Sequence, residues 1–232
     1  IIGLEFSGAE RDSMAQDLID NLESYLKLRG VDIANAVPPA LQFNPIPAGM
    51  KFDARERRFV ASKARKLAVP ANLEELAFWP VRDLAELIRT GKITSTRLTK
   101  MYLDRLKRFG PELECVITLT EERALEHARR ADEEIAGGRY RGFLHGIPYG
   151  AKDLLAVRGY RTTWGAAPYK DQSFDADAAV IRKLDEAGAV LVAKLTMGAL
   201  AWGDVWYGGT TRNPPSRKSL ENAYPAHIVR RR

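Results

Sequence analysis

Residues 144–159 read LHGIPYGAKDLLAVRG, and this stretch sets one lysine, Lys152, among small and apolar neighbours. If residues 147–153 form a strand, their side chains alternate between two faces, so that Lys152 and Asp153 point to opposite sides. Asp153 is then poorly placed to pair with Lys152. The stretch therefore predicts a strand that carries an ammonium group with no carboxylate partner from the next residue.

The residues around Lys152 favour burial. Glycine and alanine precede the lysine and let other groups approach closely, and two leucines follow Asp153. Lowering the pKa of a lysine from about 10.4 to about 7 takes roughly 4–5 kcal/mol against its charged form, and burial supplies such a penalty. A neutral lysine accepts a proton from a serine, as in Ser-Lys variants of the serine triad. We expect Lys152 to be buried and to act as a base.

Helices and short apolar strands alternate on both sides of this stretch. Helical patterns are expected from Pro80 to before Gly91, from Thr94 or Ser95 to the pair Gly110-Pro111, from Thr120 to the pair Gly137-Gly138, and, with an aspartate cap, up to Ala187. Short strands are expected at residues 115–119 and 189–193. This alternation predicts an α/β fold whose sheet is covered on both faces.

The first 75 residues read differently and are expected to form an extension. Ser7 and Glu10 have the spacing of a capping box at the start of a helix, and Gly30 is a natural stop. The proline-rich residues 37–49 are expected to form an extended strap. The basic cluster that follows is interrupted by acidic residues, so a solvated surface is favoured over a phosphate-binding patch.

Composition narrows the functional classes. The chain has 232 residues, 45% of them hydrophobic and 28% charged, with no uninterrupted apolar run long enough for a membrane span. Its single cysteine excludes an internal disulfide and suits a reducing cytoplasm, the compartment that we favour. Residues 214–232 hold five basic residues against one acidic residue, four of the six net positive charges. No nucleic-acid partner is therefore expected for the body of the chain.

Other kinds of site find less support. His127, His145, His227 and Cys115 lie far apart in the sequence, so no metal site is expected. His145 adjoins the Lys152 stretch, but a loop histidine satisfied by backbone groups is favoured over a catalytic one. Neither of the common glycine-rich nucleotide fingerprints is present, nor is the Gly-x-Ser-x-Gly elbow of serine hydrolases.

Residues 138–166, GRYRGFLHGIPYGAKDLLAVRGYRTTWGA, and 178–214, AAVIRKLDEAGAVLVAKLTMGALAWGDVWYGGTTRNP, resemble the first half of the amidase signature family. This family includes hydrolytic amidases and the A subunit of the amidotransferases that act on mischarged tRNA. The resemblance extends over residues 76–214. It implies amide hydrolysis through a Ser–cis-Ser–Lys triad and an acyl-enzyme, with no metal or organic cofactor. Lys152 matches the lysine of the family motif G-[IV]-P-x-x-x-K-D, and Lys194 matches a later, non-catalytic position.

The sequence departs from the family after residues 211–214. The family continues into a Gly/Ser-rich stretch with the bridging serine, and the nucleophile follows in a second such loop. Here no glycine follows Gly209, and the last serines, Ser216 and Ser219, are flanked by proline and basic residues. We assign neither as a nucleophile. The hypothesis is a coding sequence truncated or frameshifted near Pro214, giving a chain that is inactive alone.

The predicted architecture is a partial amidase-signature α/β fold, with a mixed β-sheet flanked by helices. Residues 1–75 would form the N-terminal extension, residues 76–213 the first half of the amidase domain, and residues 214–232 a basic tail outside the family pattern. The expected substrate is a small-molecule amide. Two alternatives stay open, a non-catalytic binding module with the tail as a nucleic-acid arm and a fragment of an aminoacyl-tRNA amidotransferase A subunit.

Overall fold

The computed structural model describes residues 5–34, 37–47, 49–51, 55, 60–62 and 67–214. The chain divides into two compact units, residues 1–59 and 60–232. Most of the basic cluster after residue 54, together with the tail serines Ser216 and Ser219, lies outside the described residues.

The first unit contains one helix, α1 (Gly8–Arg29), among its described residues. The Ser7 hydroxyl accepts from the Glu10 backbone N–H, and the Glu10 carboxylate accepts from the Ser7 backbone N–H, which confirms the predicted capping box. The helix ends at Gly30 as predicted, and none of its residues is buried. Residues 37–47 form neither helix nor strand, as expected, and all of them are exposed; the extended strap stays a prediction.

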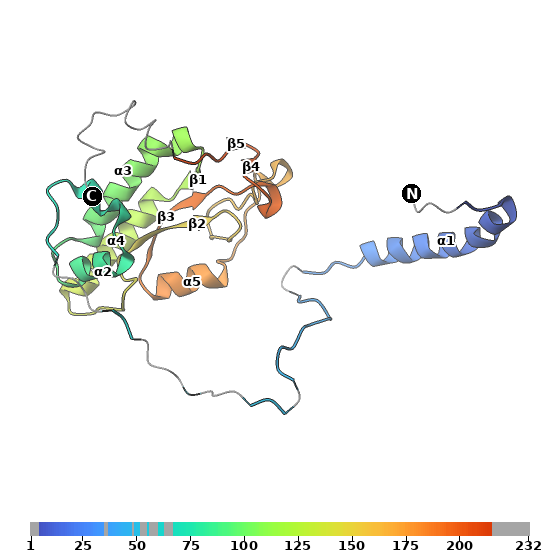
Figure 1. Ribbon diagram of the computed structural model, residues 1–232, viewed down its shortest axis with the longest axis horizontal. Helices are drawn as coiled ribbons and strands as arrows, with labels where there is room; N and C mark the ends of the chain where they lie inside the picture. The colour runs from blue at the N-terminus through green and yellow to red at the C-terminus, as the bar shows by residue number, and fades with distance from the viewer. Residues whose placement is uncertain are drawn as a thin grey trace. The chain divides into compact units, whose positions relative to one another are not determined.

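The second unit alternates helices with short strands (Figure 1). In chain order its described elements are η1 (Leu73–Phe78), α2 (Val81–Arg89), α3 (Ser95–Leu113), β1 (Val116–Leu119), α4 (Glu121–Ala136), β2 (Pro148–Lys152), η2 (Ala167–Tyr169), α5 (Ala179–Glu186), β3 (Val190–Leu195), η3 (Ala199–Ala201), β4 (Val205–Trp206) and β5 (Gly209–Thr210).

The central sheet is mixed, with strand order β1-β3-β2. Strand β1 runs antiparallel to β3, and β2 runs parallel to it with Lys152 opposite Leu195. The parallel pair needs a long connection, which α5 and its flanking loops provide. Strands β4 and β5 form a separate antiparallel ribbon. The predicted α/β class with a mixed sheet is confirmed.

Helices cover both faces of the sheet (Figure 1). Successive side chains of β3 point alternately to the two faces. Val190 and Val192 pack with Leu103 of α3 and with two alanines of α4. Leu191, between them, points the other way and packs with Ile181 of α5. A strand buried on both sides explains the continuous apolar run that the sequence shows at this position.

Two helix ends differ from the sequence expectation. Helix α3 continues through Pro111 to Leu113, although Pro111 cannot donate to the carbonyl of Lys107. Helix α5 begins after Ala178 without a side-chain cap, because Asp177 instead accepts the backbone N–H of Arg158. At α5 a tertiary contact of Asp177 therefore overrides the local capping signal.

A third cluster of buried side chains lies between η1, α2 and α3. Its members are Leu76, Leu84, Ala85, Leu87, Ile88, Ile93, Leu98, Met101 and Ile147. Leu67, Val69 and Leu73 pack against it, so the packing of the second unit begins before residue 76. The boundaries 1–75, 76–213 and 214–232 stay predictions.

Candidate active site

Lys152, the predicted base, is the last residue of β2, and its side chain is exposed. This side chain forms no hydrogen bond or ion pair with any residue that the structure describes. The expected burial of Lys152 is therefore wrong. Strand alternation places Ala151 and Asp153, which are both buried, on the side of β2 opposite to the exposed Lys152. That Lys152 and Asp153 face opposite sides is confirmed.

The fully buried lysine is Lys194 of β3, whose side chain is 0% exposed. Its ammonium group has two hydrogen-bond acceptors and one ion-pair partner. The Asp153 Oδ1 atom lies at 2.7 Å, the Arg161 carbonyl at 2.8 Å and the Thr162 hydroxyl at 3.0 Å. Burial lowers the pKa of Lys194 and the Asp153 carboxylate opposes that shift. One ion pair and two hydrogen bonds at these distances suit the protonated form.

The carboxylate of Asp153 is as enclosed as its partner, at 0% exposed. Its second oxygen, Oδ2, accepts the backbone N–H of Thr163 at 2.8 Å and the Thr163 hydroxyl. Asp153 thus joins the end of β2 to β3 and to the loop that follows Arg161. A lysine directly after the apolar run of β3 was the sequence signal for this pair, but sequence alone did not connect Lys194 with Asp153.

Backbone hydrogen bonds fix the chain on both sides of Lys152. The Lys152 carbonyl accepts from the Leu155 N–H at 3.0 Å, and the Asp153 N–H donates to the Leu195 carbonyl at 2.8 Å. Earlier in the same strand, Gly150 lies against the Leu195 side chain, and a Cβ at this glycine would come within 2.6 Å of the Leu195 Cδ1 atom. The main chain that carries the candidate base is therefore held in place while its side chain is free.

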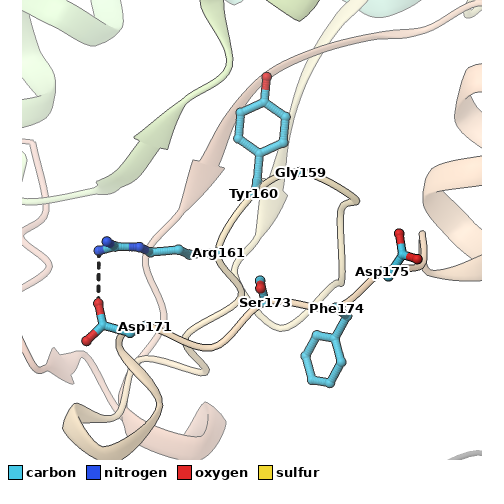
Figure 2. A pocket seen from close by; sticks show the side chains of 7 residues that line it. All are labelled: Gly159, Tyr160, Arg161, Asp171, Ser173, Phe174 and Asp175. Atoms are coloured by element: carbon cyan, nitrogen blue, oxygen red, sulfur yellow. Dashed lines mark ion pairs between the residues drawn. The ribbon is translucent and has the colours of Figure 1, made fainter.

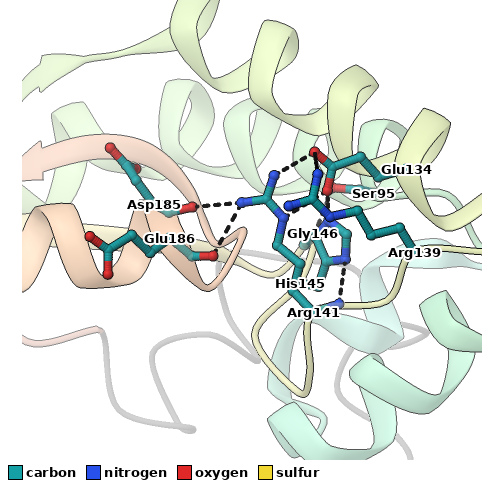
Figure 3. Close-up of polar contacts among 8 residues, drawn as sticks. All are labelled: Ser95, Glu134, Arg139, Arg141, His145, Gly146, Asp185 and Glu186. Atoms are coloured by element: carbon teal, nitrogen blue, oxygen red, sulfur yellow. Dashed lines mark hydrogen bonds and ion pairs between the residues drawn. The ribbon is translucent and has the colours of Figure 1, made fainter.

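A second polar cluster surrounds His145, in the loop before β2 (Figure 3). His145 is 1% exposed, and its Nδ1 atom accepts the backbone N–H of Arg141 at 3.2 Å. Its Nε2 atom lies 3.3 Å from a Glu134 carboxylate oxygen. The predicted histidine satisfied by backbone is confirmed for Nδ1, and the contact with Glu134 identifies Nε2 as the protonated nitrogen.

Arg141 ties this cluster to the turn before β3. Its guanidinium group forms a bidentate pair with Glu134 and donates to the carbonyls of Asp185 and Glu186 (Figure 3). Nearby, the Ser95 hydroxyl donates to the Gly146 carbonyl at 2.8 Å. These bonds join α3, α4 and the α5–β3 turn to the loop that enters β2, so the cluster supports the strand that carries Lys152.

A hollow of about 400 Å³ opens beside the loop that contains Arg161 (Figure 2). Its lining residues are Gly159, Tyr160, Arg161, Asp171, Ser173, Phe174 and Asp175. Arg161 and Asp171 pair across it at 3.2 Å, and both side chains are largely exposed. Lys152 is not among the lining residues.

The segment that ends in Pro214 is anchored on Glu114, the residue that ends α3. The Glu114 carboxylate accepts the Thr210 backbone N–H at 2.7 Å and pairs with the Arg212 guanidinium. Glu114 itself has φ 48°, ψ 43°, a left-handed conformation that is costly for a residue with a side chain. The Thr211 hydroxyl lies 2.7 Å from that of Thr196, just after β3. Sequence reasoning gave Glu114 no role.

The other residues considered for chemistry have ordinary surroundings. Cys115 is half-buried, and burial raises the pKa of its thiol. Burial is the main cause that lowers the pKa of His127. Within the described parts of the chain, no three His, Cys, Asp or Glu side chains gather as a metal would need. In the same parts, no helix has the length and apolar character to cross a membrane.

Comparison with known proteins adds family information to this geometry. The Amidase family model matches residues 97–220. The chain is 40% identical over 132 residues to AmiD of Mycobacterium bovis, which carries the name of an amidase. It is 38% identical over 143 residues to the A subunit of the glutamyl-tRNA(Gln) amidotransferase of Nitrosomonas europaea. These alignments cover 56% and 60% of this chain, and 28% and 29% of the relatives.

The solved structures that match the chain include an amidase as well. The native peptide amidase of Stenotrophomonas maltophilia is 34% identical with a TM-score of 0.56, over 60% of this chain and 30% of that one. The chain thus spans less than a third of the length of the relatives it matches.

Proposed function

The chain belongs to the Amidase family, and on this premise we propose that it carries the general base of a serine-dependent amide hydrolysis, Lys152. The observation that supports this most directly is the position of Lys152 in the motif of residues 146–153, at the end of a strand whose backbone is fixed. The exposed side chain, without a partner among the described residues, is available to a group outside them.

In the proposed reaction Lys152 acts in its neutral form. It accepts a proton from a bridging serine, which in turn accepts the proton of the nucleophilic serine. The nucleophile attacks the carbonyl carbon of a small-molecule amide, the amine leaves with a proton, and water then hydrolyses the acyl-enzyme. Neither serine is assigned in this chain. We therefore propose that the 232-residue chain alone does not hydrolyse amides.

A direct assay tests the second part of the proposal. The purified chain, incubated with a panel of peptide and aryl amides, should release no more ammonia or amine than buffer does. Measurable hydrolysis that disappears in Lys152→Ala would contradict the proposed inactivity and would still leave Lys152 as the base.

A chimera tests the first part. Residues 76–213 would replace the corresponding third of the Stenotrophomonas maltophilia peptide amidase, and hydrolysis of a peptide amide would be measured. We expect turnover by the chimera and a loss of about 100-fold or more in kcat for Lys152→Ala, because general bases contribute on that scale. Lys100→Ala, at an exposed position of α3, is the matched control and should retain activity.

Equal activity of the Lys152→Ala and Lys100→Ala chimeras would overturn the assignment of the base. A fold check by circular dichroism accompanies each chimera, so that a lost activity is read only from folded protein. The comparison requires no knowledge of the natural substrate.

A second candidate function follows from the likeness to the amidotransferase subunit of Nitrosomonas europaea. In that case the chain would act within a complex that transfers ammonia to an acyl group on tRNA. Affinity purification of the tagged chain from its own cells distinguishes the two functions. Recovery of other amidotransferase subunits in fixed ratio favours the second, and recovery of the chain alone favours the first.

A further inference from the structure

The Asp153–Lys194 ion pair lies immediately beside the candidate base, but the mechanism proposed above gives it no task. Asp153 follows Lys152 in the chain, and all of its interactions face away from Lys152. A buried ion pair is a weak source of stability, because the desolvation of two charges offsets most of their attraction. Its presence next to a base therefore calls for a reason other than stability.

We propose that Lys194 is a positioning residue for Lys152, acting through Asp153: it neutralises the carboxylate beside the base and holds that carboxylate on the far side of β2. The inference rests on the proposed function of Lys152. The Lys194 ammonium lies 2.7 Å from Asp153 Oδ1, and Thr163 supplies both hydrogen bonds to Oδ2. With both oxygens occupied, the carboxylate is not available as a partner for the Lys152 side chain.

Electrostatics gives this arrangement a consequence for Lys152. A carboxylate without a counter-ion attracts a cation several ångströms away, and this attraction favours the ammonium form of a neighbouring lysine. An ammonium group can neither accept a proton nor attack a carbonyl. Paired with Lys194, the same carboxylate forms a neutral unit whose field is much weaker at Lys152. The pair therefore weakens the attraction that would favour the ammonium form of Lys152.

The reactivity of Lys152 towards an acylating reagent measures this effect without any enzyme activity. The full 232-residue chain is labelled at pH 9 with a trace of acetic anhydride, and the extent of labelling at Lys152 is divided by that at Lys100, using peptide mass spectrometry. In Lys194→Met the Asp153 carboxylate loses its counter-ion, while Thr163 still donates to its Oδ2 atom. We expect the ratio to fall by about threefold or more.

A double variant separates electrostatics from structural damage. Asp153→Asn combined with Lys194→Met removes both charges, so the ratio should return to within about twofold of the wild-type value. A purely structural role predicts the opposite, since the double variant loses more native contacts than the single one. Thr120→Val is the control for lost stability, because the Thr120 hydroxyl also holds β3, at the Leu191 carbonyl, 2.7 Å away. Its ratio should equal that of the wild type.

Lys194→Gln is a second variant, used in case Lys194→Met does not fold. Its amide removes the charge but keeps N–H donors for the buried acceptors. The ratio is read from whichever of the two variants keeps its circular dichroism spectrum. An unchanged ratio in a folded variant, or failure of both to fold, overturns the proposal and leaves the pair with a role in the fold alone. An inactive chimera would overturn the proposed function instead, since the labelling ratio does not depend on turnover.

Discussion

Gly188 and His145 lie in contact across the turn between α5 and β3. A Cβ atom built on Gly188 would come within 2.3 Å of the imidazole Cδ2 atom, and the glycine has φ +79°. His145 cannot give way, because Arg141 and Glu134 hold both of its nitrogens. The turn therefore requires glycine for two reasons, its backbone conformation and the imidazole packed against it.

Gly188→Ala should lower the free energy of unfolding by about 3 kcal/mol, the sum of a left-handed alanine and an overpacked site. The control is Gly138→Ala, where φ is +85° but no atom lies within 4 Å of the new methyl group. That variant should lose only about 1–2 kcal/mol. Urea unfolding of both proteins checks the difference, and equal losses would show that the His145 contact costs nothing.

Acid should destabilise the second unit through the polar cluster around His145. Burial lowers the pKa of His145, against the opposing effect of Glu134, and the bonds from Arg141 lower the pKa of Glu134. Each group binds fewer protons in the folded state than in the unfolded state just below its ordinary pKa. Stability is therefore lost as the pH falls below 6.5 for His145 and below 4.5 for Glu134.

His145→Asn removes the first of these titrations and keeps an oxygen that can accept the Arg141 N–H. The groups around the ring are Glu134, Arg139, Arg141, Asp132 and the ring of Tyr140. We expect the fall in unfolding free energy between pH 7.5 and pH 5 to be smaller in this variant than in the wild type. Urea titrations at both pH values measure it, and parallel pH profiles would assign the acid sensitivity to other groups.

Removal of residues 1–59 should leave the second unit intact. These residues form a compact unit of their own, and no residue of α1 is buried. A chain of residues 60–232 is therefore expected to unfold within about 2 °C of the full chain, a change that corresponds to at most about 0.5–1 kcal/mol. Thermal unfolding followed by circular dichroism at 222 nm checks this, with the loss of the α1 signal as an internal control. A drop of 10 °C would contradict it.

The sequence predicted the order of helices and strands because periodicity and caps are local. The helix stops at Gly30 and at Gly137, the strand at residues 115–119 and the opposite facing of Lys152 and Asp153 all follow from neighbours in the chain. What it missed depends on distant residues. The burial of Lys152 depends on what covers the outer side of β2, and a pattern of small and apolar residues does not supply that information.

In the candidate site too, the sequence predicted what depends on neighbouring residues and missed a contact between distant ones. The motif predicts that Lys152 is the base, and this stays a prediction. The pairing of Asp153 with Lys194 joins residues 41 positions apart along the chain through a parallel sheet contact. No local spacing encodes such a pair. A charged residue directly after a run of buried apolar residues was the available sign, because a buried lysine requires a partner.

Glu114 is expected to hold the segment before Pro214 at the expense of backbone strain. Glu114→Ala removes its bonds to the Thr210 N–H and to Arg212, and should lower the unfolding free energy by about 1–2 kcal/mol. Glu114→Gly loses the same bonds but relieves the left-handed conformation, so it should be about 1 kcal/mol more stable than the alanine variant.

Arg212→Ala is the matched control, because it removes only an ion pair whose arginine is 63% exposed. Exposed pairs contribute at most about 1 kcal/mol, so this variant should stay close to the wild type in urea unfolding. Limited trypsin digestion gives a second reading, with cleavage after Arg212 faster in Glu114→Ala than in the wild type. If Glu114→Gly were less stable than Glu114→Ala, the conformation at residue 114 would not be strained, and the anchor would act through its side chain alone.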